Sequence, residues 1–345
     1  IQATGYVPEM QVAYQVKRKV EVTLLREAGE NTVFDMALFG GADTGRSITI
    51  TGNTLIDSYN SEGQGKTYPN GKGNKGHIGT NSKSTSPEAV RIIGNSEING
   101  TVYIGPEGDV NDAITVSGNV DLSGEPPADT FDTVRTLPEV IPPEIPPGLE
   151  DRGSLSHSGN SDYHVSGNGR YSSISLSGNG DLIFDSNVSF IYVEGNFKRT
   201  GNGDIIVNSD MVLYIGGNFE FTGNGELHVE GGHTLTVYVG GNITGTGNGI
   251  INTSQDPTKV LIFGLDTCSE VKITGNADLY GAVYARNAEI KVTGNGDVYG
   301  SLVGNKISIS GNSDVHYDEA LAYSQNVPGA PTYDARYVLR SWNER

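Results

Sequence analysis

The chain has 345 residues, of which 48 are glycine and one is tryptophan, a composition that suits many turns and slender repeating units better than a helical globule. The net charge of −18, from 23 basic and 41 acidic residues, argues against nucleic-acid binding, because neutralising phosphates requires clustered Lys and Arg. The single cysteine, Cys268, excludes an internal disulfide, so backbone pairing and burial must hold the fold together.

The N-terminal residues 1–38 alternate apolar and polar side chains but lack the repeat that follows them. Val20, Val22 and Leu24, for example, occupy alternate positions. A period of two is typical of β-strands. We therefore predict a long strand or hairpin here, which docks on the repeats or caps them.

Residues 39–124 contain the first repeats. The segment 48–53 reads Ile-Thr-Ile-Thr-Gly-Asn, and Gly-Asn pairs return at Gly94 and Gly118, each with an acid three residues after the glycine. Residues 60–86 are rich in Gly, Asn, Ser, Lys and Thr, which is typical of a loop. We predict the first coils of a solenoid, interrupted by a long loop.

The segment 125–150 holds half of the chain's 14 prolines. Proline cannot donate a hydrogen bond to a strand ladder, so this segment must leave the repeats. A flexible interdomain linker is one interpretation. Apolar side chains such as Phe131, Leu137 and Ile141 favour a strap packed on the solenoid, because a solvated linker does not need them.

A Ser/Thr-Gly-Asn triplet recurs through residues 151–318, the predicted main solenoid. Its glycines lie 23, 22, 24, 28, 19 and 17 residues apart, as expected when each repeat is one supersecondary unit stacked on the last. Glycine accepts positive φ and asparagine tolerates it, so each Gly-Asn pair turns the chain. The predicted turn and ladder residues are Gly178, Asn179, Gly201, Asn202, Gly223, Asn224, Gly247, Asn248, Gly275, Asn276, Gly294, Asn295, Gly311 and Asn312.

These patterns predict an all-β fold: a parallel, right-handed β-helix, or β-solenoid, with strand caps at its N- and C-terminal ends. An uncovered last coil would expose ladder groups and apolar side chains. Residues 319–345, which include Tyr337, Leu339 and Trp342, are the predicted C-terminal cap. We expect this tail to pair with residues 10–26.

An acidic residue follows each triplet except the one at Gly247. Stacked about 4.8 Å apart, the carboxylates would form a column that could hold Ca²⁺, which prefers several oxygen ligands. The alternative, which we favour, is that these acids cap the turns and keep an exposed face soluble, and that the chain has no metal or cofactor. The candidate column consists of Asp181, Asp204, Glu226, Asp278, Asp297 and Asp314.

Catalysis must be considered, because carbohydrate-cleaving enzymes also use parallel β-helices. Such chemistry requires paired carboxylates across a cleft, or acids beside a base. Here the acids follow the repeat, the arginines Arg170, Arg199 and Arg286 lie in no motif, and the six histidines show no metal-ligand spacing. We therefore predict no catalytic residue. Binding of glycans through surface tyrosines, or polysaccharide degradation, is the alternative function.

Several short sequence segments resemble those of a known protein family. They are residues 50–59, 76–81, 100–106, 279–285 and 315–321, together with the proline strap, and they span about residues 34 to 342. They resemble bacterial type IV pilus assembly proteins of the minor-pilin type, in which an N-terminal membrane helix precedes a Gly-Asn-rich β-solenoid.

The resemblance implies a non-catalytic, extracellular structural or adhesive module at the cell surface. Its implied partners are other pilus or surface-filament subunits, with glycans as further candidates. The family's membrane helix is absent from these residues, so we expect a soluble chain whose helix was removed or left out, or one that assembles by another route. Head-to-tail stacking of solenoid ends into a filament is such a route.

Overall fold

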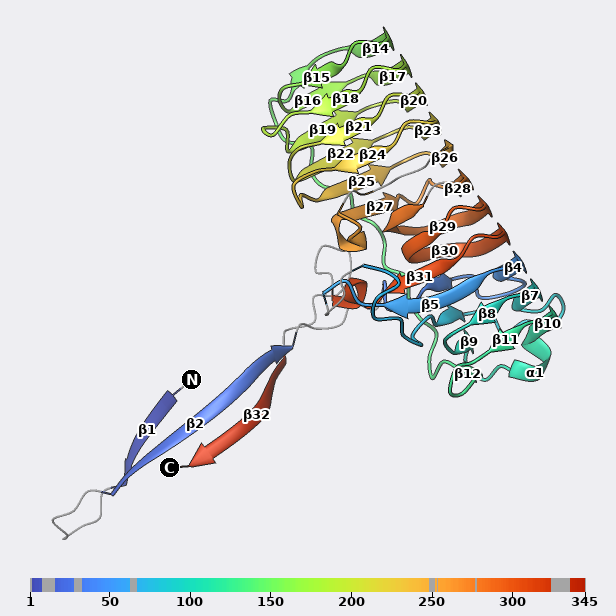
Figure 1. The fold of residues 1–345 in the computed structure, drawn as a ribbon, viewed down its shortest axis with the longest axis vertical. Helices are drawn as coiled ribbons and strands as arrows, with labels where there is room; N and C mark the ends of the chain where they lie inside the picture. The colour runs from blue at the N-terminus through green and yellow to red at the C-terminus, as the bar shows by residue number, and fades with distance from the viewer. Residues whose placement is uncertain are drawn as a thin grey trace.

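The computed structural model describes residues 2–7, 16–27, 33–62, 67–247, 252, 254–276, 278–323 and 336–344, with side chains from residue 33 to residue 323. The predicted parallel β-solenoid is confirmed (Figure 1). Neighbouring coils pair in parallel and in register, so Phe197 lies beside Phe219 and Gly201 beside Gly223. Apolar side chains at alternate strand positions fill the interior from one end of the stack to the other.

The strands before the strap are β3 (Leu38–Gly40), β4 (Ile48–Gly52), β5 (Leu55–Tyr59), β6 (Ile78–Thr80), β7 (Val90–Gly94), β8 (Glu97–Ile98), β9 (Val102–Ile104), β10 (Ile114–Gly118), β11 (Asp121–Leu122) and β12 (Ala128–Thr130). Three short helices interrupt the described strands: α1 (Val110–Ala113), η1 (Pro257–Lys259) and η2 (Glu319–Tyr323). The predicted loop 60–86 therefore contains a strand, β6, because Ile78 is apolar and fully buried in the stack.

After the strap the strands are β13 (Glu150–Asp151), β14 (Ser154–Gly159), β15 (Tyr163–Val165), β16 (Gly169–Tyr171), β17 (Ser173–Gly178), β18 (Leu182–Phe184), β19 (Phe190–Val193), β20 (Phe197–Gly201), β21 (Ile205–Val207), β22 (Met211–Ile215), β23 (Phe219–Gly223), β24 (Leu227–Val229), β25 (Leu235–Val239), β26 (Ile243–Gly247), β27 (Val260–Gly264), β28 (Glu270–Gly275), β29 (Leu279–Gly294), β30 (Val298–Gly311) and β31 (Val315–Asp318). Strands β15, β18, β21 and β24 form a separate parallel sheet along the stack.

The coils are not stacked in sequence order. Strand β4 pairs with β30 on one side and with β7 on the other, and β5 likewise pairs with β31 and β8. The chain therefore enters the solenoid in its middle, runs to the end formed by β10, crosses to the opposite end at β14 and returns coil by coil to β31 (Figure 1). We call the contact between the first and the last coil the coil junction.

The predicted cap on the last coil needs correction. Strands β3, β4 and β5 of the first coil cover β30 and β31. The tail forms β32 (Arg336–Glu344), which pairs antiparallel with β2 (Val16–Glu27) through residues 20–27, so the expected pairing is confirmed for residues 20–26; β2 also pairs with β1 (Gln2–Val7). Residues 10–15 of the expected partner range lie outside the described residues. No described strand of this sheet pairs with a solenoid strand.

The proline-rich segment packs against the solenoid as a strap. Arg135 and Asn81 exchange two hydrogen bonds, from the Arg135 backbone N–H to Oδ1 at 2.9 Å and from Nδ2 to the Arg135 carbonyl at 2.8 Å. The Tyr284 hydroxyl donates to the Pro138 carbonyl, and Val140 is 3% exposed. Ile141, in contrast, is 68% exposed. The strap therefore bridges the two ends of the stack and is held most firmly beside the coil junction.

The Gly-Asn corners have the backbone geometry that glycine permits. The triplet glycines from Gly178 to Gly311 have φ between +104° and +147°. The asparagine amides bond from coil to coil, as in Asn202 Nδ2 to Asn179 Oδ1 at 2.8 Å, and Asn53 Nδ2 to Asn312 Oδ1 at 2.9 Å continues the column across the coil junction. Asn248 lies outside the described residues.

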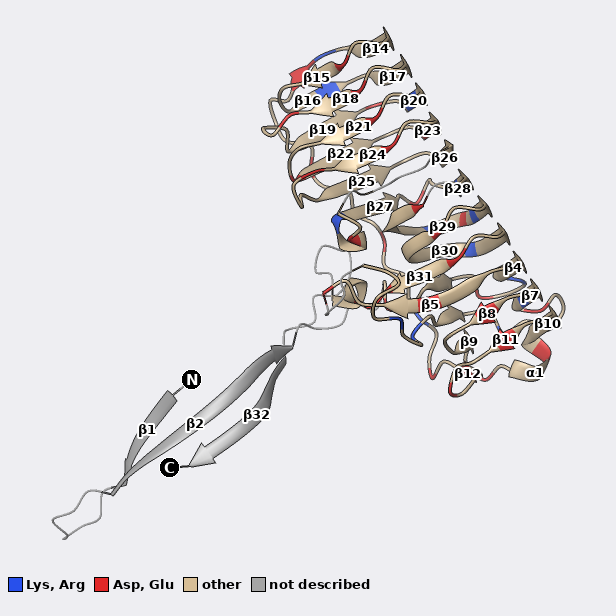
Figure 2. Ribbon diagram, viewed as in Figure 1, with Lys and Arg blue, Asp and Glu red and all other residues tan. Residues whose placement is uncertain are grey.

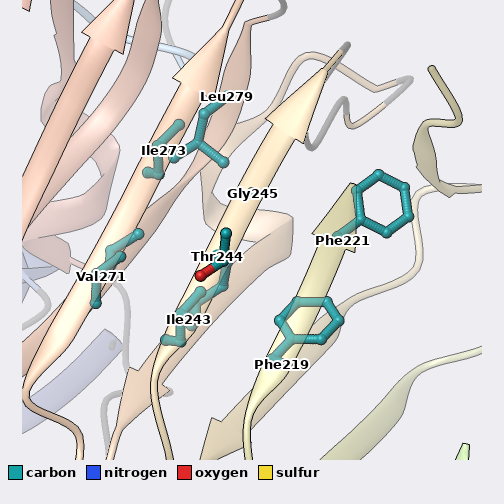
Figure 3. Close-up of a pocket in the computed structure, with 10 residues that line it drawn as sticks. Phe219, Phe221, Ile243, Thr244, Gly245, Val271, Ile273 and Leu279 are labelled. Carbon is teal, nitrogen blue, oxygen red and sulfur yellow. The ribbon is translucent and has the colours of Figure 1, made fainter. Parts of the chain in front are cut away.

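An internal apolar cavity of about 20 Å³ lies beside Gly245 (Figure 3). In neighbouring coils Phe221 and Ile273 occupy the matching register position, and a Cβ on Gly245 would meet no atom within 4 Å. Gly245→Ala is expected to raise the free energy of unfolding by about 0.5–1 kcal/mol, because it fills space and restricts the unfolded chain.

Thermal unfolding of the variant and the parent measures this effect. The matched control is Gly264→Ala, whose Cβ would lie 2.8 Å from the Ala285 Cβ and 2.9 Å from the Cys268 Sγ, so it should destabilise. Equal melting of Gly245→Ala and Gly264→Ala would contradict the assignment of the cavity.

Candidate functional site

At the coil junction, the long loop that interrupts the first coils lies against the last coil of the repeat. The first coil supplies β5, the long loop supplies Tyr68 and Lys72, and the last coil supplies His316 on β31. Along the stack, Tyr280, Tyr299, His316 and Asp57 occupy one register column. The position that is a tyrosine in two successive coils is therefore a histidine in the last coil and an aspartate in the first.

His316 and Asp57 form a buried pair. The His316 Nδ1 lies 2.6 Å from the Asp57 Oδ1, and both side chains are 2% exposed. The Tyr68 ring stacks on the imidazole at 3.7 Å between centroids, and its hydroxyl donates to the Asp57 Oδ2 at 3.0 Å. Lys72 lies 3.7 Å from the same oxygen. The long loop thus covers the pair and satisfies the carboxylate.

The acidic column makes regular contacts with the backbone of the next coil. The Oδ1 atoms of Asp181, Asp204 and Asp297 each accept the backbone N–H of the corresponding acid one coil further, at 2.8 to 2.9 Å. Asp314 Oδ1 accepts the Leu55 N–H at 2.7 Å, so the pattern crosses the junction. These carboxylates cap turns, and Figure 2 shows Asp and Glu recurring from coil to coil.

Two members of the column differ from the others. Burial raises the pKa values of Asp297 and Asp314. One oxygen of each carboxylate and one ring nitrogen of His316 lie within 4.8 Å of one another. The column acids Asp181, Asp204, Glu226 and Asp278 form no such group with a histidine among the described residues.

A groove of about 440 Å³ opens beside the same junction. Tyr103 and Phe131 stack in it at 5.0 Å, and the Arg135 guanidinium lies over the Phe131 ring at 5.2 Å. His77 Nδ1 accepts the Thr101 N–H at 2.9 Å, and burial lowers the pKa of this histidine. The lining residues are Asp35, Met36, Lys75, His77, Tyr103, Phe131, Arg135, Tyr317, Glu319, Ala322 and Tyr323. Aromatic and charged groups thus share one concave surface.

The arginines considered in the sequence have structural contacts. Arg199 is 2% exposed and donates to the carbonyl oxygens of Gly203, Thr200 and Gly180, while burial lowers its pKa. Arg170 bonds Asp151 at 2.8 Å, and Arg286 pairs with Asp266. Each guanidinium has partners in a neighbouring coil, which explains why no motif surrounds it.

Asp318 is fully buried beneath the junction. Its Oδ1 accepts the backbone N–H groups of Ser61 and Ala320 at 2.9 and 3.1 Å, whereas its buried Oδ2 has no partner in the part of the chain that the structure describes. Burial raises the pKa of Asp318 to about 6. The unfolded carboxyl titrates near pH ~3.9. Between these values only the folded chain holds the proton, so this group's contribution to stability falls as pH rises through the interval.

Asp318→Asn removes that titration and is expected to stabilise the chain at pH 7. The stability gap between Asp318→Asn and the parent should be about 2 kcal/mol larger at pH 7 than at pH 4. Denaturant unfolding of both proteins at the two pH values measures the gap. A gap that does not change with pH would show that Asp318 is ionised equally in both states.

The sequence reasoning missed the pair of His316 and Asp57: both residues lie in segments that carry the family resemblance, but nothing in the sequence links the two segments or gives either residue a role. The available signal was a change of residue type within the repeat. His316 lies five residues after the glycine of its triplet, where the two preceding coils carry Tyr280 and Tyr299. Asp57 comes from 259 residues away, and only the stacking order brings it to the histidine.

Comparisons with known proteins are sparse. A family model described as a domain of unknown function, DUF7305, matches residues 199–324. No curated protein sequence matches the chain. Among solved structures, the chain is similar to the competence-associated pilin ComZ from Thermus thermophilus, with 12% identity and a TM-score of 0.33, over 95% of this chain and 78% of that one. A likeness this distant carries no conclusion about function. No helix among the described residues is long and apolar enough to span a bilayer.

Proposed function

We propose that this chain is a non-catalytic structural or adhesive module of a bacterial surface appendage, located outside the cell. The observation that carries the proposal is the insertion of the solenoid between two paired strands, β2 and β32. Its entry and exit therefore lie together, and a rigid body is held from one attachment sheet. Such an arrangement suits a module that presents its surface to other molecules, since the solenoid surface away from the attachment sheet is available for contacts.

The two ends of the stack support assembly into filaments. Among the described strands, β14 pairs only with β17 and β10 pairs only with β7, so each end presents an edge strand. Edge strands carry unpaired N–H and C=O groups that can accept a strand from another chain. The two ends differ in sequence, so their contact would be heterologous and could propagate. The expected partners are other appendage subunits or further copies of this chain.

The experiment combines two kinds of microscopy. Antibodies raised against the purified chain are expected to label the surface or appendages of intact producing cells by immunogold. Negative-stain images of the purified full chain are expected to show fibres if it assembles with itself. Label confined to the cell interior would overturn the proposal, whereas surface label without fibres would leave other subunits as the partners.

Polysaccharide binding or degradation is the second candidate. The observation that favours it is aromatic surface: Tyr192 and Tyr214 lie 5.0 Å apart on the outside of neighbouring coils, and Tyr103 and Phe131 stack in the groove. Stacked rings of this kind can contact sugar faces. Retention of the chain on insoluble cellulose, chitin or peptidoglycan tests binding, and release of reducing ends tests degradation. Failure of both would remove this candidate.

A further inference from the structure

The group formed by His316, Asp297 and Asp314 is more than an acidic cluster. The imidazole is almost wholly buried, at 2% exposure, and each carboxylate is half-buried. One ligand atom from each of the three residues lies within 4.8 Å of the others. A buried imidazole beside two carboxylates is a donor set that divalent metals bind.

The orientation of the histidine is fixed by Asp57. This carboxylate lies 2.6 Å from Nδ1, so it holds the proton there and leaves the Nε2 lone pair available. Metal-binding histidines almost always use one nitrogen for the metal and bond the other to a carboxylate or carbonyl. Tyr68 adds to the restraint by stacking on the ring and by donating to Asp57.

The two aspartates are also held in place. Asp297 Oδ1 accepts the Asp314 N–H at 2.9 Å, and Asp314 Oδ1 accepts the Leu55 N–H at 2.7 Å. Each carboxylate therefore keeps its Oδ2 for another contact. The backbone of two successive coils fixes both side chains before any ion binds, which lowers the entropic cost of binding.

We propose that the coil junction binds one Zn²⁺ ion through His316 Nε2 and the carboxylates of Asp297 and Asp314, with water as a further ligand. One nitrogen and two oxygens suit Zn²⁺, whereas Ca²⁺ takes six to eight oxygen ligands. The site differs from the calcium column predicted from the sequence, because it depends on the histidine. The ion would join Asp297, which directly precedes β30, to Asp314 and His316 in the next coil, while Asp57 of β5 orients the histidine. It would therefore fasten the last two coils of the chain to each other.

Titration calorimetry of Zn²⁺ into the chelator-treated full chain tests the site. The expected result is one ion per chain, with affinity reduced at least about tenfold by Asp57→Asn and more by His316→Gln or by Asp297→Asn with Asp314→Asn. The matched control is His228→Gln, because His228 Nε2 lies 3.5 Å from Asp204 and 3.3 Å from Glu226, but no carboxylate among the described residues bonds its Nδ1 as Asp57 bonds that of His316. This control should bind Zn²⁺ like the parent.

Two further measurements separate binding from folding. Circular dichroism of each variant without metal checks that it is folded, and the half-buried Asp297 and Asp314 replacements serve if His316→Gln does not fold. Co²⁺ in place of Zn²⁺ should give an intense visible absorption band, which indicates that the ion has a low coordination number. This band should be lost in His316→Gln and in the double aspartate variant. Absence of Zn²⁺ binding by the parent, or equal binding by the folded variants, would overturn the proposal.

Discussion

Valine at Gly223 is expected to lower the free energy of unfolding by about 3 kcal/mol or more, because two separate penalties combine. Gly223 has a φ of +120°, which a β-branched residue resists. A Cβ there would also collide with the carbonyl oxygen of Gly201 in the preceding coil. The coils would have to move apart, and the hydrogen bonds between them would weaken.

Gly159→Val is the matched control for that substitution. Gly159 has nearly the same φ, +124°, but it lies in the end coil, and a Cβ there would meet no atom within 4 Å. It should cost only the backbone strain, about 1–2 kcal/mol. Denaturant unfolding of both variants measures the difference. Equal losses would show that close stacking of the corners contributes little, and parent-like melting of Gly223→Val would mean that the corner is wrongly assigned.

Removing the Asp57 carboxylate is expected to destabilise the chain by about 3 kcal/mol when metal is chelated. Asp57→Ala leaves a buried histidine and the Tyr68 hydroxyl without their acceptor, and a buried polar group without a partner is costly. The first and last coils would lose a buried polar contact. Hydrogen exchange should therefore rise in β5 and β31 more than in β20, which lies several coils away.

An exposed ion pair provides the comparison. Lys198 and Glu220 lie 2.9 Å apart in neighbouring coils, with side chains 49% and 35% exposed. Glu220→Ala should cost less than about 1 kcal/mol, because water screens the pair. If Asp57→Ala costs no more than Glu220→Ala, the buried pair does not hold the junction together.

The coils were predictable from sequence because their determinants are local. A Gly-Asn corner, alternating apolar residues and an acid after the turn are each read within about ten residues, and they specify one coil wherever it is placed. The apolar residues of the strap likewise indicated a packed segment. These features depend on neighbours in the chain and not on which coil lies above or below.

The stacking order was not predictable for the same reason. Corners such as Gly52, Gly118 and Gly311 are nearly alike, so the repeat does not say which coil pairs with which. The strap carries the chain from one end of the stack to the other, so the coils after it are stacked out of sequence order. Because the stacking order could not be predicted, the pairing of Asp57 with His316 could not be predicted either. For the same reason the tail was wrongly expected to cover the last coil.

Disulfide trapping tests the stacking order most directly. Thr51 and Ser310 are register partners across the coil junction, and paired strands place such residues about 4.8 Å apart, which a disulfide can span. Thr51→Cys with Ser310→Cys, in a Cys268→Ala background, is expected to oxidise to one intramolecular disulfide that mass spectrometry identifies as a linked peptide pair. The comparison pair, Ser117→Cys with Ser158→Cys, would be adjacent only if the coils followed sequence order, and it should stay reduced. Linkage of the comparison pair, with none between positions 51 and 310, would contradict the coil junction.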